Sequence, residues 1–414
     1  MQVKKFLGPY KDLPGSIYII FFARIVNSMG NFVMPFLTIF LTDHEGYTKL
    51  EAGKFVMIAA MFYALGTIIG GKVCDHAGRK KMLIIFQGLS ASILLLCAFK
   101  SLNKIIPYLL ILAGFFVGAA GPPQTAMVTD LTDRENRKPS FSFLYLGNNI
   151  GFALGPMIAG FLYRRHLPFL FVADALTTIA SLILVWLYVK ETLPHGSDIK
   201  RDGKGMDYER AEVGSVFSAI LKRPRLVTFS LIMIIYSLVY AQYTFSLPIQ
   251  INEIFKYDGP KIFGILMTVN ALTVVFITPF ITNATLKYEP IFPILLGGIQ
   301  YAIGFGMIYF IDTIPLFMIS TVAWTAGEIL NSTNTGVYIA NNTPISHRGR
   351  FSAFLYIISG TGYAFGPYVT GWFIDVYGIK NVWIMCFLLS ILSSSLIGGL
   401  IISSKRAEGH KKSA

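Results

Sequence analysis

Charged residues are scarce in this chain of 414 residues. Asp, Glu, Lys and Arg together make up 14% of it, whereas hydrophobic residues make up 54% and the mean hydropathy is +0.60. A soluble chain of this length would divide into two or three domains with well-charged surfaces, and this composition excludes that class. The sequence therefore predicts an integral membrane protein.

Cysteine is also rare, and the three cysteines are Cys74, Cys97 and Cys386. An odd number of widely spaced cysteines excludes a disulfide framework and a cysteine-based metal cluster. The six histidines fall in predicted loops or at helix ends, so we expect no metal site and no cofactor. The chain carries no P-loop pattern and no cluster of candidate catalytic side chains, so we expect that it is not an enzyme.

Long apolar segments are what the chain has instead. Each is near the roughly 20 residues needed to cross a hydrocarbon core of about 30 Å. They lie at 16–42, 50–73, 82–99, 105–129, 141–163, 168–189, 226–250, 261–285, 291–311, 314–340, 351–376 and 380–403. The predicted fold class is all-α, with twelve transmembrane helices.

Basic residues are distributed unevenly over the predicted loops. Most of the 35 Lys and Arg residues lie at the N-terminus, in the C-terminal tail and in alternate loops, beginning with the loop that carries Arg79. Because basic residues are retained in the cytoplasm, both termini are predicted to be cytoplasmic. The formal net charge of +13 then reflects topology and contact with an anionic lipid bilayer, and we expect no nucleic-acid partner.

One segment occurs twice along the chain. Residues 151–160 read GFALGPMIAG and residues 362–371 read GYAFGPYVTG, a shift of 362 − 151 = 211 residues. The repeat predicts two copies of one helical unit. Small residues at four-residue spacing let helices approach closely, so helix packing is the favoured role of the repeated set, which comprises Gly151, Gly155, Pro156, Gly160, Gly362, Gly366, Pro367 and Gly371.

The duplication also divides the chain. We predict an N-terminal six-helix bundle at 1–189, a cytoplasmic linker at 190–225, and a C-terminal six-helix bundle with a cytoplasmic tail at 226–414. The linker is either plain connecting chain or contains a short amphipathic helix around 208–221, which would lie on the inner membrane surface.

The loop between the second and third predicted spans carries the strongest local motif. It reads Gly71-Lys-Val-Cys-Asp75-His76-Ala-Gly78-Arg79-Lys-Lys. This segment resembles the signature loop of the major facilitator superfamily, Gly-x-x-x-Asp-Arg-x-Gly-Arg-Lys, although His76 stands where that family usually has a basic residue.

The resemblance covers nearly the whole chain and implies that family's architecture. It implies that spans 1, 4, 7 and 10 line a central cavity and that two bundles rock around a site near the midplane. It also implies that Gly71, Asp75, Gly78 and Arg79 form a latch, or gate, on the cytoplasmic side. Asp130, at the end of the fourth span, either joins this latch or belongs to a solvated helix end.

Glu328 is the deepest acidic residue in the predicted spans. It lies 14 residues into the tenth span, about 21 Å along the helix axis at a rise of roughly 1.5 Å per residue. The residues at three- and four-residue spacing that share its face are Trp324, Asn331, Thr335 and Tyr338. If this face lines the cavity, Glu328 can exchange a proton or bind a cationic substrate, and Trp324 offers an aromatic surface. A buried neutral acid is the alternative.

Other polar side chains mark the first and seventh spans. Arg24, Asn27 and Asn31 share one face of the first span and are predicted to line the substrate cavity. Arg24 is either an ion-pair partner of Glu328 or a structural arginine bonded to carbonyl groups. In the seventh span, Tyr236, Tyr240, Gln242 and Tyr243 suit a wide cavity but are equally normal as packing residues. Asp174 and Asp375 fall near the outer ends of their spans, where water can reach them, and we assign them no transport role.

The glycine-rich fifth span is similar to the antiporter motif of drug-efflux members of the family, with Ala159 replacing one of a terminal pair of glycines. The fourth span lacks the arginine that those antiporters often carry. The resemblance implies a monomeric exporter of amphipathic or cationic drug-like small molecules in exchange for protons, in the inner membrane of a bacterium. A proton-coupled importer of a polar nutrient, or a lipid-linked sugar flippase, remains open on the same fold.

Overall fold

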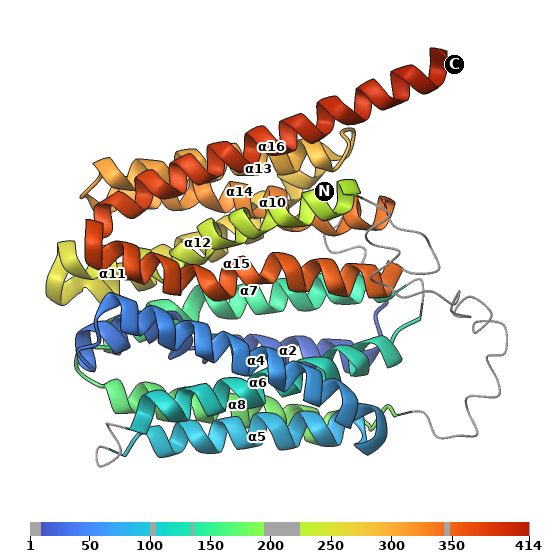
Figure 1. Cartoon of the computed structure of the whole chain (residues 1–414). Helices are drawn as coiled ribbons and strands as arrows, with labels where there is room; N and C mark the ends of the chain where they lie inside the picture. The colour runs from blue at the N-terminus through green and yellow to red at the C-terminus, as the bar shows by residue number, and fades with distance from the viewer. Residues whose placement is uncertain (1–9, 100–104, 134–135, 194–223, 343–347, 414) are drawn as a thin grey trace. The chain divides into compact units, whose positions relative to one another are not determined.

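The computed structural model of the chain describes residues 10–99, 105–133, 136–193, 224–342 and 348–413 (Figure 1). Within these ranges the side chains of Asp75, Lys138, Ala340 and residues 348–357 and 404–413 are not described. The described residues form helices and no strand. The predicted all-α class is therefore confirmed for this part of the chain.

The helices of the first half follow the predicted spans closely. The first span is divided into α2 (Gly15–Met29), a 3-10 turn (Met34–Phe36), α3 (Leu37–Ile39) and a π-helical turn (Phe40–His44). It is followed by α4 (Lys49–Ala77), α5 (Arg79–Cys97), α6 (Ile106–Asp130), α7 (Arg137–Leu162) and α8 (Leu167–Tyr188).

The second half repeats this order. Its first span consists of α10 (Pro224–Tyr240), a 3-10 turn η6 (Ala241–Tyr243) and α11 (Ser246–Phe255), and a further turn (Lys256–Asp258) leads to α12 (Gly259–Thr285). Then come α13 (Ile291–Met307) with a 3-10 turn (Ile308–Phe310), α14 (Ile314–Asn341), α15 (Arg348–Tyr377) and α16 (Ile379–Ser413).

Eight stretches of the described residues are both long and apolar enough to cross a membrane, and one of them, Pro224–Thr285, covers two consecutive spans. The helices α7, α14 and α15 lie outside these stretches although they contain 26, 28 and 30 residues. Their sequences are interrupted by glycine and by polar side chains, including Glu328 in α14. Their length is thus that of a membrane span, while their composition is that of helices facing other protein segments or polar groups.

The chain divides into two compact units. Unit 1 comprises Met1–Tyr47, Phe55–Ser197 and Ile251–Val275, and unit 2 comprises Thr48–Lys54, Asp198–Gln250 and Phe276–Ala414. Each unit thus contains a short segment from the opposite half of the sequence. The predicted boundaries at 189 and 226 stay predictions, and residues 194–223 of the predicted linker lie outside the described residues.

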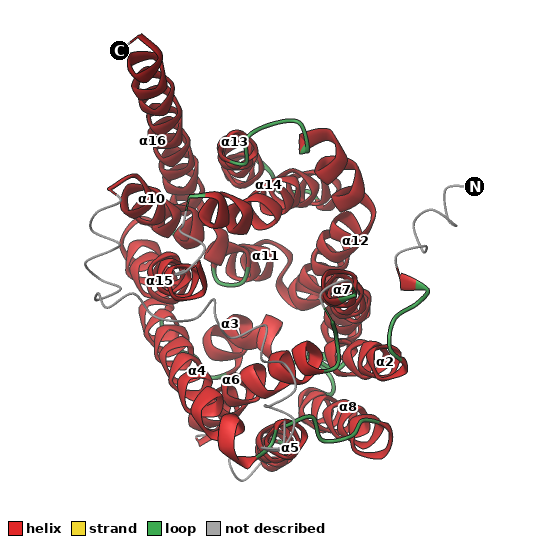
Figure 2. Cartoon of the chain, turned by 90° about the vertical axis from the view of Figure 1, so that its right-hand side faces the viewer, coloured by secondary structure: helices red, strands yellow, loops and turns green. Residues whose placement is uncertain are grey.

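Helix pairing inside the two units follows the repeat. In unit 1, α5 packs beside α6 and α8, and α2 packs beside α7 and α8 (Figure 2). In unit 2, the corresponding helices make the same pairs, since α13 packs beside α14 and α16, and α10 packs beside α15 and α16. The sequence repeat is therefore also a structural repeat.

The two prolines of the repeated set lie at helix contacts that recur with the same shift. A Cβ atom on Gly264 of α12 would lie 2.3 Å from the Pro156 carbonyl oxygen of α7, and one on Gly53 of α4 would lie 2.2 Å from the Pro367 carbonyl oxygen of α15. The two contacts are related by the shift of the repeat, because Gly264 follows Gly53 by 264 − 53 = 211 residues and Pro367 follows Pro156 by 367 − 156 = 211 residues. Only a residue without a side chain lets the backbones approach this closely.

Most glycines of the repeated set also lie against the backbone of a neighbouring segment. Added Cβ atoms would lie 2.5 Å from the Ile25 carbonyl oxygen at Gly151, 2.7 Å from the Met29 carbonyl oxygen at Gly155, and 2.0 Å from the Ile234 carbonyl oxygen at Gly362. The two outermost glycines, Gly160 and Gly371, approach the Pro260 and Lys49 carbonyl oxygens to 2.5 and 2.4 Å. Gly366 is the exception, with only ordinary contacts at 3.4 Å. These contacts favour the packing role of the repeated segment.

Each half of the chain begins with an interrupted helix, and the interruptions are equivalent. The first begins at Gly30, after α2, and the second at Ala241, after α10, and 241 − 30 = 211. A proline follows each one, Pro35 in the first span and Pro248 in α11. A proline ring lacks an N–H and clashes with the carbonyl four residues earlier, and in both cases that position falls inside the interruption. The sequence thus explains both breaks, although the apolar pattern alone predicts uninterrupted spans.

Candidate functional site

Glu328 of α14 lies in unit 2 beside a group of tyrosines. Its side chain is half-buried and interacts electrostatically with the phenols of Tyr240, Tyr243, Tyr301 and Tyr363. Tyr240 is the last residue of α10, Tyr243 belongs to the turn η6, Tyr301 to α13 and Tyr363 to α15. Four helical segments therefore bring aromatic hydroxyl groups to one carboxylate.

These tyrosines and Trp324 form a continuous set of rings, here called the aromatic cluster: Tyr240, Tyr243, Tyr301, Trp324 and Tyr363. The ring centroids of Tyr243 and Trp324 are 5.5 Å apart, and those of Tyr240 and Tyr243 are 4.7 Å apart. The Trp324 ring is fully buried and stacks on Phe305 at 5.6 Å, whereas Tyr363 is exposed. The cluster thus has a buried side on α13 and an accessible side on α15.

The predicted face of α14 is present, and it points into unit 2. Trp324, Asn331 and Thr335 are buried, while Glu328 and Tyr338 are partly exposed. Asn331 packs against α13, since a Cβ on Gly297 would lie 2.8 Å from its Nδ2 atom. Glu328 and Trp324 are brought together with the tyrosines of α10, whereas Asn331 lies between α13 and α14.

Two predicted cavity residues of the seventh span are engaged inside unit 2. The Tyr236 hydroxyl donates to the Ile294 carbonyl oxygen at 3.2 Å and contacts Ser394 Oγ at 3.3 Å. The Gln242 amide donates to the Leu238 carbonyl oxygen at 2.8 Å and accepts from Ser246 Oγ at 2.6 Å. Both side chains are buried. Their contacts are those of packing residues, and a cavity role for them stays a prediction.

The polar face of the first span lies inside unit 1. The Asn27 amide donates to Thr178 Oγ1 of α8 at 3.1 Å, and Asn27 and Asn31 line a pocket between α2, α5, α6 and α8. Arg24 lines a smaller neighbouring pocket, and its buried Nε atom has no hydrogen-bond partner among the residues that the structure describes. Arg24 belongs to unit 1 and Glu328 to unit 2, so their pairing stays a prediction.

Asp174 corrects an expectation drawn from the sequence. Water access was expected from its place near the end of a span, yet its side chain is only 9% exposed. Its Oδ2 atom accepts the backbone N–H groups of Phe32 at 3.2 Å and Val33 at 3.3 Å, in the interruption that follows α2. The interruption explains the error, because it supplies unpaired N–H groups that an uninterrupted helix would not offer. Asp375, by contrast, has an exposed contact, accepting the Leu50 N–H at 2.9 Å.

The signature loop is closed by a residue that the sequence analysis missed. The Glu191 carboxylate, which follows α8, accepts the N–H groups of Arg79 at 2.7 Å, Lys80 at 3.2 Å and Lys81 at 3.2 Å. These are the unpaired donors at the N-terminus of α5, where a negative charge is favourable. Gly78 has a φ of +105°, and a Cβ there would lie 2.7 Å from Glu191 Oε2. The glycine of the motif is therefore required twice, by its backbone conformation and by the carboxylate.

Hydrogen bonding also determines the acidity of Glu191. Partial burial would by itself raise the pKa of this carboxyl, but the N–H groups of Lys81, Lys80, Leu193 and Arg79 together lower the pKa below its ordinary value. Glu191 is thus a charged cap for α5 near neutral pH.

Arg79 and Asp130 form an ion pair next to this cap. Their Nε and Oδ2 atoms are 3.3 Å apart, Arg79 also donates to the Cys74 carbonyl oxygen at 3.0 Å, and Thr192 Oγ1 donates to Asp130 at 3.2 Å. The structure therefore brings two of the predicted latch residues together. Gly71 makes only ordinary contacts with Pro122, at 3.8 Å, and the side chain of Asp75 lies outside the described residues. A gating role for the set stays a prediction.

Unit 1 contains a second cluster of polar residues that the sequence did not predict. Arg164, just after α7, pairs with Asp43 and donates to Asn252 Oδ1 at 2.9 Å and to the Lys256 carbonyl oxygen at 3.2 Å. Lys256 is the one described non-glycine residue with a positive φ, at 49°. Because these residues come from three separate chain segments, their proximity could not be derived from spacing.

Comparisons with known proteins agree with this architecture. A sequence model of the Major Facilitator Superfamily matches residues 20–314 and 259–414. Among similar structures, a transporter of the POT family in complex with 5-aminolevulinic acid superposes with a TM-score of 0.74 at 14% identity, covering 95% of this chain and 96% of that one.

Three bacterial relatives illustrate the range of similar proteins. The uncharacterized MFS-type transporter YqjV of Bacillus subtilis is 24% identical, covering 92% of this chain and 89% of its own. A Na(+), Li(+), K(+)/H(+) antiporter of Planococcus maritimus is 23% identical, covering 82% and 86%. The class H tetracycline resistance protein of Pasteurella multocida is 31% identical over 183 residues, covering 43% and 45%.

The family match spans the helices of both halves, and the structural likeness extends over almost the whole chain. This protein is consequently a multi-pass membrane transporter, not an enzyme, with twelve transmembrane helices in two pseudo-symmetric six-helix bundles, and it belongs to the Major Facilitator Superfamily.

Proposed function

We propose that the protein is a secondary active transporter that exports drug-like small molecules in exchange for protons by alternating access. The observation that carries the proposal is Glu328, a half-buried carboxylate that interacts with four phenols of the aromatic cluster inside unit 2. An ionised side chain at the centre of a membrane span costs about 2.5–3.5 kcal/mol and is normally retained for a site.

The chemistry of the cluster suits an amphipathic or cationic substrate. A cation over an aromatic face gains about 0.5–2 kcal/mol, and it gains most where water is excluded. A carboxylate at the same place can hold either that cation or a proton, so the two compete. The tetracycline resistance protein supports a drug-like substrate for this chain, and the antiporter from Planococcus maritimus supports exchange with H+.

The remaining elements have proposed roles in the same cycle. Glu328 binds the proton from outside and releases it to the inside, and the substrate then competes for the vacated carboxylate. The loop residues Gly71, Asp75, Gly78, Arg79 and Asp130 form the cytoplasmic gate. The protein acts as a monomer in the bacterial inner membrane with both termini in the cytoplasm, as the loop charges indicate.

The test is transport by purified protein in vesicles with an imposed pH gradient, using cationic dyes and tetracyclines as candidate substrates, with sugars and peptides for comparison. Glu328→Gln keeps the shape of the side chain and removes its charge, so we expect uptake driven by the gradient to fall to the level of empty vesicles. Counterflow of labelled substrate without a gradient should persist.

Glu289→Gln is the matched control, because Glu289 is an exposed acid outside the helices. It should transport like the unmodified protein. Gradient-driven transport that is unchanged in Glu328→Gln would remove this residue from the mechanism. Flux in the opposite direction, with accumulation on the cytoplasmic side, would instead identify an importer.

A further inference from the structure

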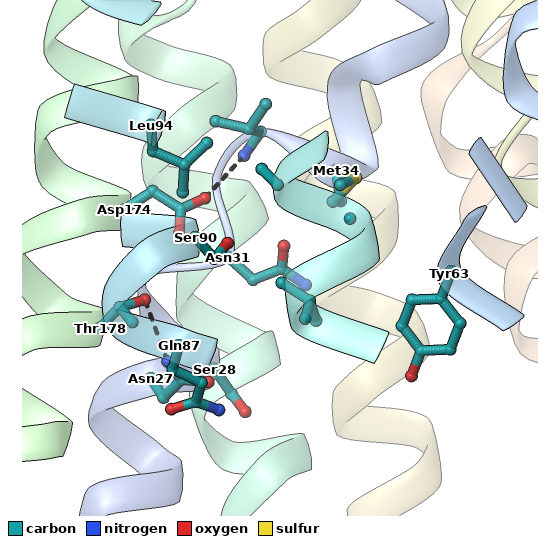
Figure 3. Close-up of a pocket in the computed structure, with 14 residues that line it drawn as sticks. Asn27, Ser28, Asn31, Met34, Tyr63, Gln87, Ser90, Leu94, Asp174 and Thr178 are labelled. Carbon is teal, nitrogen blue, oxygen red and sulfur yellow. Dashed lines mark hydrogen bonds between the residues drawn. The ribbon is translucent and has the colours of Figure 1, made fainter. Parts of the chain in front are cut away.

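Unit 1 contains a polar pocket that the proposed transport site does not use. It has a volume of about 250 Å³ and lies between α2, α5, α6 and α8 (Figure 3). Its polar lining consists chiefly of Asn27, Asn31, Gln87, Ser90, Asp174 and Thr178. In the view of Figure 3, Asp174, Ser90 and Asn31 lie toward one end of the pocket, and Asn27, Gln87 and Thr178 lie toward the other.

The spacing of these residues along their helices agrees with that arrangement. Gln87 and Ser90 of α5, and Asp174 and Thr178 of α8, are each separated by about one helical turn, so each of these two helices places one polar group at either end of the pocket. Asn27 lies in α2, and Asn31 lies in the interruption that follows α2. The end that contains Asp174 therefore offers a carboxylate from α8, a hydroxyl group from α5 and an amide from the interruption after α2.

Asp174 is a buried acid without a charged partner. Its Oδ2 atom accepts two backbone N–H groups, and no Lys, Arg or His side chain forms an ion pair with it in the part of the chain that the structure describes. A carboxylate in a membrane span needs compensation by a proton or by a cation.

The size and chemistry of the pocket distinguish the possible ligands. Pockets for drug-sized ligands run from about 300 to 1,000 Å³, and this one is smaller. At about 30 Å³ per water, it has room for an ion and several waters. Amide, hydroxyl and carboxylate oxygens are the ligands of hard cations. A proton on Asp174 would need neither this volume nor this lining.

The charge of the site indicates a monovalent ion. One carboxylate supplies one negative charge, and the described residues contain no group of three or more His, Cys, Asp or Glu side chains that could hold a metal ion. Arg24 is the basic residue of α2, and it lies three positions before Asn27. It lines the smaller pocket, beyond Asn27 and Gln87. The end with Asp174 is the one farther from Arg24.

We propose that this pocket binds an inorganic monovalent cation of the size of Na+ or Li+, with Asp174 as its charged ligand and Asn31 and Ser90 as neutral oxygen ligands. The bound cation keeps Asp174 ionised, and an ionised carboxylate is the stronger acceptor for the Phe32 and Val33 N–H groups. Occupancy of the site therefore stabilises the interruption that follows α2. Ion sites of transporters commonly lie beside discontinuous helices.

The test is equilibrium binding of 22Na+ to the purified full-length protein in detergent, with choline chloride holding the ionic strength constant. We expect saturable binding of one ion per chain. Asp174→Asn should weaken it by roughly tenfold or more, because it removes the charged ligand but keeps an oxygen acceptor for the two N–H groups. Ser90→Ala, which changes one neutral ligand, should weaken binding less and guards against a folding defect in the first variant.

Hydrogen exchange gives a second readout. Na+ should slow exchange of the backbone amides at residues 32 and 33, and choline should not. Asp375→Asn is the matched control, because this acid lies outside the pocket and contacts the Leu50 N–H. Glu328→Gln should bind 22Na+ normally, so failure of the transport proposal and failure of this one are distinguishable.

Three results would overturn the proposal: absence of saturable 22Na+ binding, unchanged binding in Asp174→Asn, or amide protection at residues 32 and 33 that responds to acid but not to Na+. The last result would show that Asp174 binds a proton alone.

Discussion

Replacing Gly78 by alanine tests how the signature loop is held. Gly78 has a φ of +105° and a ψ of 146°, in a region of backbone conformations that is nearly restricted to glycine. Forcing a residue with a side chain into such a region costs about 1–3 kcal/mol. The new Cβ would also lie 2.7 Å from Glu191 Oε2, so the carboxylate must move from the N-terminus of α5.

The loss of this cap adds to the strain. A side-chain cap is worth about 0.5–2 kcal/mol. Glu191 is exposed, so solvent screening places its contribution in the lower part of that range. We expect Gly78→Ala to lower the free energy of unfolding by about 1.5–4 kcal/mol. The assay is thermal unfolding of the purified protein in detergent, followed by tryptophan fluorescence.

Gly88→Ala is the matched control, because Gly88 belongs to α5, the helix that Gly78 precedes. Gly88 lies in the interior of α5, and no atom of the described residues lies within 4 Å of the position of an added Cβ. Alanine there should stabilise the protein by roughly 0.5–1 kcal/mol, because it reduces the freedom of the unfolded chain. The same substitution, glycine to alanine, is thus expected to lower the free energy of unfolding at Gly78 and to raise it at Gly88.

A double-mutant cycle separates the two causes. In the background of Glu191→Ala, Gly78→Ala should cost only the backbone strain, so the two effects should not add. Equal losses for Gly78→Ala and Gly88→Ala, or a midpoint for Gly78→Ala that matches the unmodified protein, would refute the reasoning.

Three further predictions concern contacts described above. Because folding lowers the pKa of Glu191, its carboxylate stabilises the folded protein fully above the ordinary Glu pKa of 4.5. This stabilisation is lost as the pH falls through the lower pKa of the folded state. The difference in melting temperature between the unmodified protein and Glu191→Gln should therefore shrink over that acidic range. Gly264→Ala should cost about 1–3 kcal/mol by overpacking α12 against Pro156, and a melting temperature equal to that of the unmodified protein would contradict the close contact. Arg79→Ala should lower the free energy of unfolding by only about 0.2–1 kcal/mol, and by less at high salt. If the ion pair with Asp130 is part of the gate, the same variant should strongly reduce transport in vesicles.

The sequence predicted the fold well because the information is local. Apolar length gives most of the helices, although α7, α14 and α15 lie outside the stretches that are apolar enough to cross a membrane. The repeated glycines and prolines indicate close helix contacts and the equivalence of the two halves. The interruptions at Gly30 and Ala241 could also have been found, since Pro35 and Pro248 each follow them within a few residues. The predicted spans run across them, because apolar residues flank both interruptions.

The candidate sites were predicted less completely, for a different physical reason. Helical spacing correctly places Trp324 and Glu328 on one face, but it gives no information about which residues of other helices that face meets. Tyr301 and Tyr363 therefore entered only with the structure. Asp174 was misjudged because its partners are backbone N–H groups, which no side-chain pattern reveals.

The contact of α7 with the first part of α12, together with that of α15 with the start of α4, has a consequence for how such a protein can arise and be assembled. A gene encoding only one half would yield a polypeptide in which the glycines and prolines of these contacts lack their partner segments. Two such polypeptides, produced separately in one cell, should recognise each other through these contacts and co-purify without a peptide bond between them. The glycine contacts would then serve as mutual recognition elements of a duplicated ancestor, in which two identical chains exchanged the same segments before fusion joined them.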